Sequence, residues 1–215
     1  MKITHAPIPT LPSHQLNDVL KKMNIIDLIN YASASPKCEN DVKSMMPRRK
    51  LKLEIHRKRF YLRLCHERFT YKDVSIYVHN KQTFKKTDKK INIKGCPVVM
   101  KQDGRYLHFY FKNEVNGFIF ILDYISDLFW SPPINLFMEA EDTKIGWLEI
   151  TNWIKNKRNS EVESVKYEAL DKFEKEDLVY MRNNIRASTV SNSESSDLFT
   201  TDLSLFIHHF PQPQK

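Results

Sequence analysis

Glycine and cysteine are scarce in this chain of 215 residues. Its four glycines, at positions 95, 104, 117 and 146, do not cluster. Loops that bind nucleotide phosphates need clustered glycines, because the backbone must approach the anion closely. The three cysteines, at positions 38, 65 and 96, form no Cys-x-x-Cys pair, which argues against a zinc knuckle and against a disulfide framework. The composition therefore excludes the common nucleotide-binding enzymes and indicates a reducing compartment.

Long hydrophobic runs are also absent. The longest apolar run covers residues 118–122, and Asp123 ends it. A helix that spans a bilayer needs roughly 20 apolar residues, and residues 1–7 lack the apolar stretch of a signal peptide. We therefore expect a protein that neither enters a membrane nor is secreted, and that works in the cytoplasm, the nucleus or both.

The sequence lacks the residue patterns that catalysis commonly uses. It contains no His-Glu-x-x-His, no Gly-x-Ser-x-Gly, and no two histidines at helical spacing beside a carboxylate. His208 and His209 are adjacent in a strand-like segment, so their side chains point to opposite faces and do not easily share one metal ion. We therefore predict a protein that is not an enzyme and that holds no metal and no cofactor.

Charge is segregated along the chain. Residues 47–112 carry 19 basic and 5 acidic side chains, a net charge of +14, whereas residues 113–215 carry 10 basic and 17 acidic ones, a net charge of −7. The basic residues alternate with apolar ones, which favours the solvent face of an antiparallel sheet. The alternative is a nucleic-acid-binding surface of cations and stacking rings. Its contacts would be Arg57, Lys58, Arg59, Lys85 and Lys86, with Tyr61, Tyr71, Tyr77 and Phe84 as the rings.

The first 46 residues show the period of helices. Leu16, Val19, Leu20 and Met23 follow the spacing i, i+3, i+4, i+7, which places them on one helical face, and Pro12 suits the first turn of that helix. The spacing therefore predicts a first amphipathic helix.

Two further helices are predicted by their capping residues. Asn24 is placed to cap a second helix, with Asp27 in its first turn and Leu28 on its buried face. Ser35 and Pro36 are typical of the N-cap and first residue of a third helix. Three helices in about 40 residues form only a small core.

From residue 51 the period changes to two. Leu51, Leu53 and Ile55 alternate with polar residues, and the same pattern recurs over residues 60–64, 74–78 and 91–93. Asp103-Gly104 lies between two apolar stretches and predicts a hairpin turn. The middle of the chain is therefore predicted to be mostly antiparallel sheet, with one buried face and one basic face.

Helical and strand-like segments alternate in the last hundred residues. A helical stripe over residues 115–129 precedes a short strand at 134–138, a helix at 147–158, a strand around Val165 and a helix around Met181. Residues 187–197 are polar and predict a loop, and residues 203–207 predict a last strand. This order predicts a small parallel sheet with helices on one side, or a curved β/α stack. The expected fold class is α+β.

The N-terminal pattern resembles the F-box. The matching positions are Leu11-Pro12, Leu16, Val19-Leu20, Met23, Asp27-Leu28-Ile29, Ala32 and Ser35. Residues 23–30 and 42–44 look like the version found in the expanded nematode F-box proteins. Residues 124–129, 133–134, 150–154 and 176–178 are similar, more weakly, to the type 2 F-box-associated region of those proteins, which is usually longer. The resemblance divides the chain into an F-box-like helical domain at residues 7–47 and an F-box-associated-like α+β domain at residues 51–210.

The resemblance implies a function as an adaptor. Members of the family dock on a Skp-type adaptor subunit, which links them to a cullin scaffold in a ubiquitin ligase, and their C-terminal region holds a protein substrate. The residues carried over as contacts with the Skp-type subunit are Leu11, Pro12, Leu16, Val19, Leu20, Met23, Asp27 and Leu28. We therefore expect apolar side chains near the N-terminus that their own fold leaves uncovered and that await another protein. The sequence does not identify the substrate.

Overall fold

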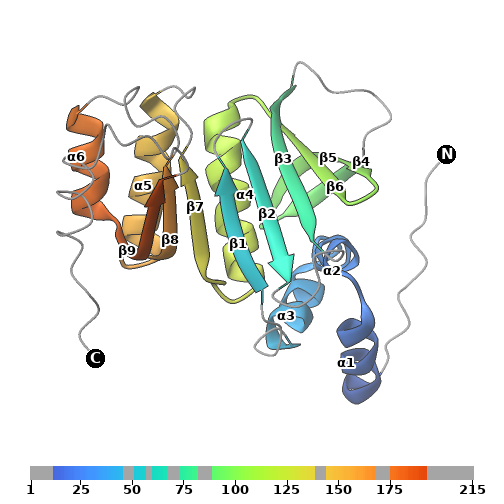
Figure 1. Cartoon of the computed structure of the whole chain (residues 1–215). Coiled ribbons are helices and arrows are strands. Elements are labelled where there is room, and N and C mark those ends of the chain that lie inside the picture. Colours follow the sequence, from blue (N-terminus) through green and yellow to red (C-terminus); the bar gives the residue numbers. More distant parts are fainter. Residues whose placement is uncertain are drawn as a thin grey trace.

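The computed structural model describes residues 12–45, 51–56, 60–66, 73–81, 89–138, 144–167 and 175–192. Three helices come first, α1 (Ser13–Lys22), α2 (Ile25–Ala32) and α3 (Pro36–Met45). Six strands follow, β1 (Leu51–His56), β2 (Tyr61–His66), β3 (Val74–Asn80), β4 (Lys89–Ile93), β5 (Cys96–Asp103) and β6 (Tyr106–Phe111). The last elements are α4 (Glu114–Leu128), β7 (Ile134–Met138), α5 (Lys144–Lys157), β8 (Glu161–Tyr167), α6 (Lys175–Asn184) and β9 (Arg186–Asn192). The chain has the expected α+β class, with its helical part ahead of the sheet (Figure 1).

The described strands form one sheet, in the order β4-β5-β6-β3-β2-β1-β7-β8-β9. Strands β1 to β3 pair in antiparallel order, and so do β4 to β6. The predicted hairpin joins β5 to β6, where Gly104 has a φ of 58°, a conformation that glycine adopts readily. The pairing of β3 with β6 is parallel, with Ser75 opposite Tyr106. The middle is therefore mostly antiparallel, as predicted, with one parallel junction that joins two antiparallel groups.

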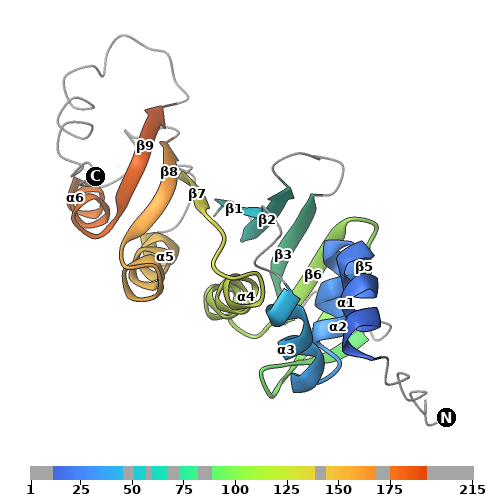
Figure 2. The same cartoon turned by 90° about the horizontal axis from the view of Figure 1, so that it is seen from below.

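The other half of the sheet is parallel. Strands β1, β7, β8 and β9 run in one direction, and helices α4, α5 and α6 lie in a row on one face (Figure 2). This confirms the predicted parallel sheet with helices on one side. The predicted loop at residues 187–197 is wrong for its first part, because β9 extends to Asn192. Backbone pairing with β8 forms that strand although its side chains are mostly polar. The predicted strand at residues 203–207 lies outside the described residues.

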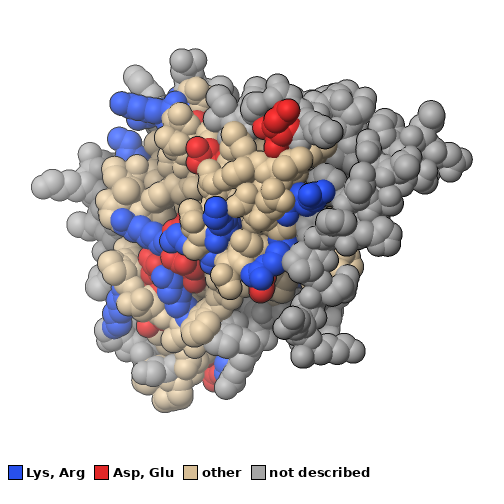
Figure 3. Space-filling view, turned by 90° about the vertical axis from the view of Figure 1, so that its left-hand side faces the viewer, with Lys and Arg blue, Asp and Glu red and all other residues tan. Residues whose placement is uncertain are grey.

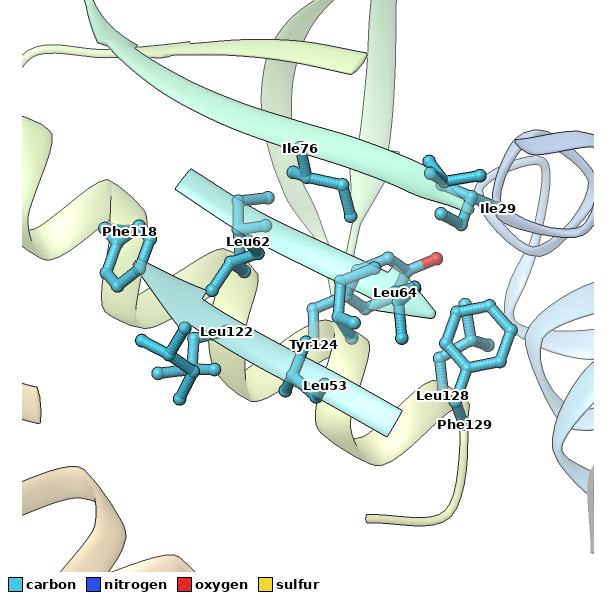
Figure 4. Packing of buried hydrophobic residues seen from close by; sticks show 14 of the residues in the cluster. Ile29, Leu53, Leu62, Leu64, Ile76, Phe118, Leu122, Tyr124, Leu128 and Phe129 are labelled. Atoms are coloured by element: carbon cyan, nitrogen blue, oxygen red, sulfur yellow. The ribbon is translucent and has the colours of Figure 1, made fainter. Parts of the chain in front are cut away.

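The main hydrophobic core lies between the sheet and α4. Its largest fully buried side chains come from α4, β1, β2, β3 and β6 and from α1 and α2, and Ile29 of α2 reaches the same cluster (Figure 4). Gly117 permits this close packing, since a Cβ atom there would overlap the side chain of Phe111 on β6. One cluster of buried side chains thus extends from the N-terminal helices into the sheet.

Local signals place the helix ends correctly. The Asn24 side chain accepts a hydrogen bond of 2.8 Å from the backbone N–H of Asp27, as its capping role requires. The hydroxyl of Ser35 accepts one of 3.1 Å from the N–H of Cys38, so α3 begins at Pro36 as predicted. Pro12, predicted to lie in the first turn of α1, instead occupies its N-cap position, directly before that turn.

Candidate partner-binding site

Helix α1 presents an apolar surface at one end of the molecule. It packs on α3 and lies outside the row of helices that covers the sheet (Figures 1 and 2). Val19 is 46% exposed, whereas Leu16 and Met23 are partly buried against the core. Because Leu16, Val19 and Met23 are spaced i, i+3, i+7, they form a continuous strip along the helix. We call these three residues the α1 strip.

Two of the predicted partner contacts are wrong. Leu20 is 1% exposed and Leu28 is fully buried, and both belong to the hydrophobic core of the chain itself. Neither side chain can reach a partner unless this core opens. Helical spacing identified their face correctly as apolar, but the chain covers that part of it with its own side chains.

The remaining predicted contacts have different surroundings. Pro12 is exposed at the start of α1. Asp27 is exposed too, but its carboxylate accepts a 2.6 Å hydrogen bond from the side-chain amide of Asn24. Asp27 therefore stabilises the start of α2, where a carboxylate also interacts favourably with the helix dipole. Leu11 lies outside the described residues.

Helices α2 and α3 are fixed to each other. The hydroxyl of Tyr31 on α2 donates a hydrogen bond of 3.1 Å to the carboxylate of Asp41 on α3. Burial of the Tyr31 hydroxyl raises its pKa, and its hydrogen bonds to Cys38 and Asp41 raise it further. Tyr31 therefore stays protonated, and so able to donate to Asp41, at neutral pH.

The same helices are also fixed to the rest of the molecule. Asn30 donates a 3.2 Å hydrogen bond to Gln102 on β5. The indole N–H of Trp130, which follows α4, donates to the backbone carbonyl of Lys43 on α3. A partner that binds the α1 strip would therefore meet a surface already held in place by α2 and α3.

Aromatic rings cross the face of the sheet opposite α4–α6. The row begins with Phe137 on β7, which stacks on His56 of β1 at 4.2 Å between ring centroids. It continues from His56 to Tyr61 at 4.9 Å, from Tyr61 to Tyr77 at 4.9 Å, and from Tyr77 to His108 at 5.4 Å. The sequence did not reveal the whole row, because its contacts between β7 and β1 and between β3 and β6 join strands that are far apart in the chain. The face predicted to be basic is largely aromatic.

The ring row gives little support to the nucleic-acid alternative. Tyr61 and Tyr77, predicted to stack on bases, stack on each other with an interplanar angle of 25°. Their faces are therefore occupied by neighbouring rings, whereas base stacking requires a free ring face. At the Phe137 end of the row, the ammonium of Lys166 lies 6.0 Å from the ring centroid.

Several cations of the basic stretch already have acidic partners. Arg63 lies 2.7 Å from Asp73, and Lys52 lies 2.8 Å from Glu163. The predicted phosphate contacts Arg57, Lys58, Arg59, Lys85 and Lys86, and the predicted rings Tyr71 and Phe84, lie outside the described residues.

The Cys65 thiol is not activated as a nucleophile. Burial, together with the charge of Glu54, raises the pKa of the Cys65 thiol to about 12, so it is not a thiolate at neutral pH. Among the residues described, no three His, Cys, Asp or Glu side chains converge as metal ligands. In that same part of the chain, no helix combines the length and the apolar character that crossing a bilayer requires.

Comparison with known proteins identifies no relative. No family model matches the chain, and neither a curated protein nor a solved structure is significantly similar to it.

Proposed function

We propose that this protein is the substrate-recognition adaptor of a Skp–cullin–F-box ubiquitin ligase, and that it docks on the Skp-type subunit through the α1 strip. The observation that carries the proposal is the exposure of Val19 between two partly buried apolar neighbours, on a helix that lies at one end of the fold. Apolar side chains spaced i, i+3, i+7 along one helical face are the anchors that a helix lays into the groove of a partner.

The placement of the helices is consistent with this role. The α1 strip belongs to the segment that resembles an F-box, and its members hold three of the positions carried over from that resemblance. Helices α5 and α6, at the C-terminal end of the F-box-associated-like region, lie at the opposite end of the sheet from α1 (Figure 1). An adaptor needs such a separation, because it must bind the ligase at one place and the protein substrate at another.

The experiment that tests the proposal compares two exposed valines. Val19 on α1 is 46% exposed and Val179 on α6 is 39% exposed, so replacing either by Asp has a similar effect on folding. We expect Val19→Asp to weaken binding of a purified Skp-type subunit by tenfold or more, because a carboxylate would be buried in an apolar interface. Val179→Asp should bind like the unchanged chain. Titration calorimetry measures both affinities.

Two outcomes would count against the proposal. Equal affinities of the Val19→Asp variant and the unchanged chain would show that α1 is not the docking helix. Absence of binding by the unchanged, folded chain would remove the adaptor function itself. Replacing Leu20 is not a usable test, because that buried side chain also supports the fold.

A further inference from the structure

A tryptophan follows helix α4 at a position where glycine is the usual residue. The backbone N–H of Ser131 donates a 2.7 Å hydrogen bond to the carbonyl of Ser126, and that of Trp130 donates one of 3.5 Å to the carbonyl of Asp127. These two bonds form a Schellman motif, in which the residue after the C-cap is left-handed and is commonly glycine. Trp130 holds that position with a φ of 59°. Because a bulky residue is strained there, the backbone alone does not account for the tryptophan.

The Trp130 ring is exposed and yet held in place. It is 59% exposed, more than any other large hydrophobic side chain in the described part of the chain. Its indole N–H donates to the backbone carbonyl of Lys43 on α3. Arg158 donates a 2.8 Å hydrogen bond to the carbonyl of Pro132, which lies on the same connection from α4 to β7. A ring fixed in this way loses little freedom when a partner covers it, and tryptophan is a common anchor of protein interfaces.

Trp130 lies at the same end of the fold as the α1 strip. Strands β1 and β7 are parallel and both begin at this end, β1 after α3 and β7 after Trp130. Strands β3 and β6 run in the same direction as β1, so Tyr106, the first residue of β6, lies at this end as well. Val19, Tyr106 and Trp130 are three of the four large hydrophobic side chains that the described residues expose. All three therefore belong to the end that carries α1 and α3 (Figure 1).

The opposite end of the molecule, at α6 and β9, has a different surface. Lys and Arg side chains lie there among Asp and Glu side chains (Figure 3). Of the four exposed hydrophobic side chains, Val179 alone belongs to this end. Single exposed hydrophobic residues are ordinary, whereas a group of them marks an interaction site. The end that carries α1 is therefore the better fit for an apolar partner surface.

Helix α3 connects the α1 strip to Trp130. It packs on α1 and on α4, and the carbonyl of its Lys43 accepts the indole hydrogen bond. The ammonium of Lys43 lies 2.6 Å from the carboxylate of Glu39, so the charge nearest this hydrogen bond on α3 is already compensated. A partner that covers the α1 strip and continues over α3 therefore reaches Trp130.

We propose that Trp130 is a second anchor for the partner of the α1 strip, so that one Skp-type subunit covers both, with α3 between them. The inference rests on the proposed function and adds to it a contact from outside the segment that resembles an F-box. The occupant is the same subunit because α3 joins the two anchors at one end of the fold. A protein substrate held at this end would compete with the ligase for the same surface.

A pair of glycine variants tests the proposal by titration calorimetry with a purified Skp-type subunit. Trp130→Gly removes the ring at a left-handed position that glycine adopts without strain, so the turn is kept. Ser131→Gly is the matched control, since Ser131 is exposed and has a φ of 51°, but its replacement keeps the ring. We expect Trp130→Gly to weaken binding at least about tenfold and Ser131→Gly to bind like the unchanged chain. Circular dichroism checks that both variants are folded.

The outcomes separate this inference from the proposed function. If Trp130→Gly binds like the unchanged chain while Val19→Asp binds weakly, the second anchor is wrong and the docking helix stands. If the unchanged chain does not bind, both fall. Equal weakening by Ser131→Gly would show that the turn matters and the ring does not, which also overturns the inference. So would sedimentation of the chain alone as a dimer that Trp130→Gly dissociates, because a second copy would then cover the ring.

Fluorine NMR observes the ring itself. The chain has three tryptophans, and Trp147 and Trp153 are only 3% and 6% exposed. With 5-fluorotryptophan in this chain and an unlabelled Skp-type subunit, the signal missing from Trp130→Gly belongs to Trp130. We expect that signal to shift on binding while the other two stay unchanged. An unshifted Trp130 signal in the saturated complex would overturn the proposed contact.

Discussion

The Nε2 atom of His79 on β3 lies 2.9 Å from the Nδ1 atom of His108 on β6. The two rings also stack, with centroids 5.2 Å apart and an interplanar angle of 23°. A hydrogen bond between two imidazoles needs one ring nitrogen that donates and one that accepts. The contact therefore exists only while at least one of the two rings is neutral, and it joins β3 to β6, the parallel junction of the sheet.

This pair predicts loss of stability in mild acid. Burial lowers the pKa of His79 below its ordinary value of about 6.5, and the charge of Glu114 opposes the effect only in part. The unfolded chain binds this proton more readily than the folded chain. The contribution of His79 to the free energy of unfolding is therefore complete above a pH of about 6.5 and is lost as the pH falls below that value.

NMR titration measures the pKa of His79, and urea unfolding at several pH values measures how the free energy of unfolding depends on pH. His79→Gln removes this titrating group and should flatten part of the pH dependence. A titration of His79 above pH 6.5 would contradict the account.

Replacing Gly117 by Ala should destabilise the fold. In an open helix this substitution is favourable by about 1 kcal/mol. At Gly117 the added Cβ would overlap the ring and Cβ of Phe111, so α4 must move away from β6. We expect a net loss of about 1–3 kcal/mol in the free energy of unfolding. Asn116→Ala, at the exposed neighbouring position, is the control, and a Gly117→Ala variant as stable as the unchanged chain would contradict this packing.

The cap of α2 gives a third prediction. Asn24→Ala removes the acceptor for the N–H of Asp27 and should cost about 1 kcal/mol of stability. Asn17→Ala, in the middle of α1, removes no described cap and should cost nothing. Thermal unfolding followed by circular dichroism compares the two, and equal midpoints would argue against the capping role.

Local signals predicted most of the elements but not how they meet. Asn24, Ser35 and Gly104 act within a few residues, so the helix starts and the hairpin could be located from the sequence. The parallel pairing of β3 with β6, and the contacts of the ring row between β7 and β1 and between β3 and β6, join strands far apart in the chain, for which the sequence carries no local signal. Strand β9 was missed because its pairing is made by the backbone and its side chains are mostly polar.

The candidate site was predicted only in part for a related reason. The spacing of Leu16, Val19, Leu20 and Met23 defines one helical face, but it does not say what covers that face. The structure divides it, because Leu20 is buried by the chain itself and Val19 is left exposed. A periodic pattern reports that a face is apolar, and only the fold determines which part of it is available to a partner.

The most direct test of the adaptor function is the hydrogen-exchange footprint of the full chain with and without a purified Skp-type subunit. We predict slower exchange in α1, around Val19, with no change in β8, which lies at the end of the sheet opposite α1 (Figure 1). Protection confined to other elements, or no protection in the presence of excess Skp-type subunit, would contradict the claim that this helix docks the protein on a ubiquitin ligase.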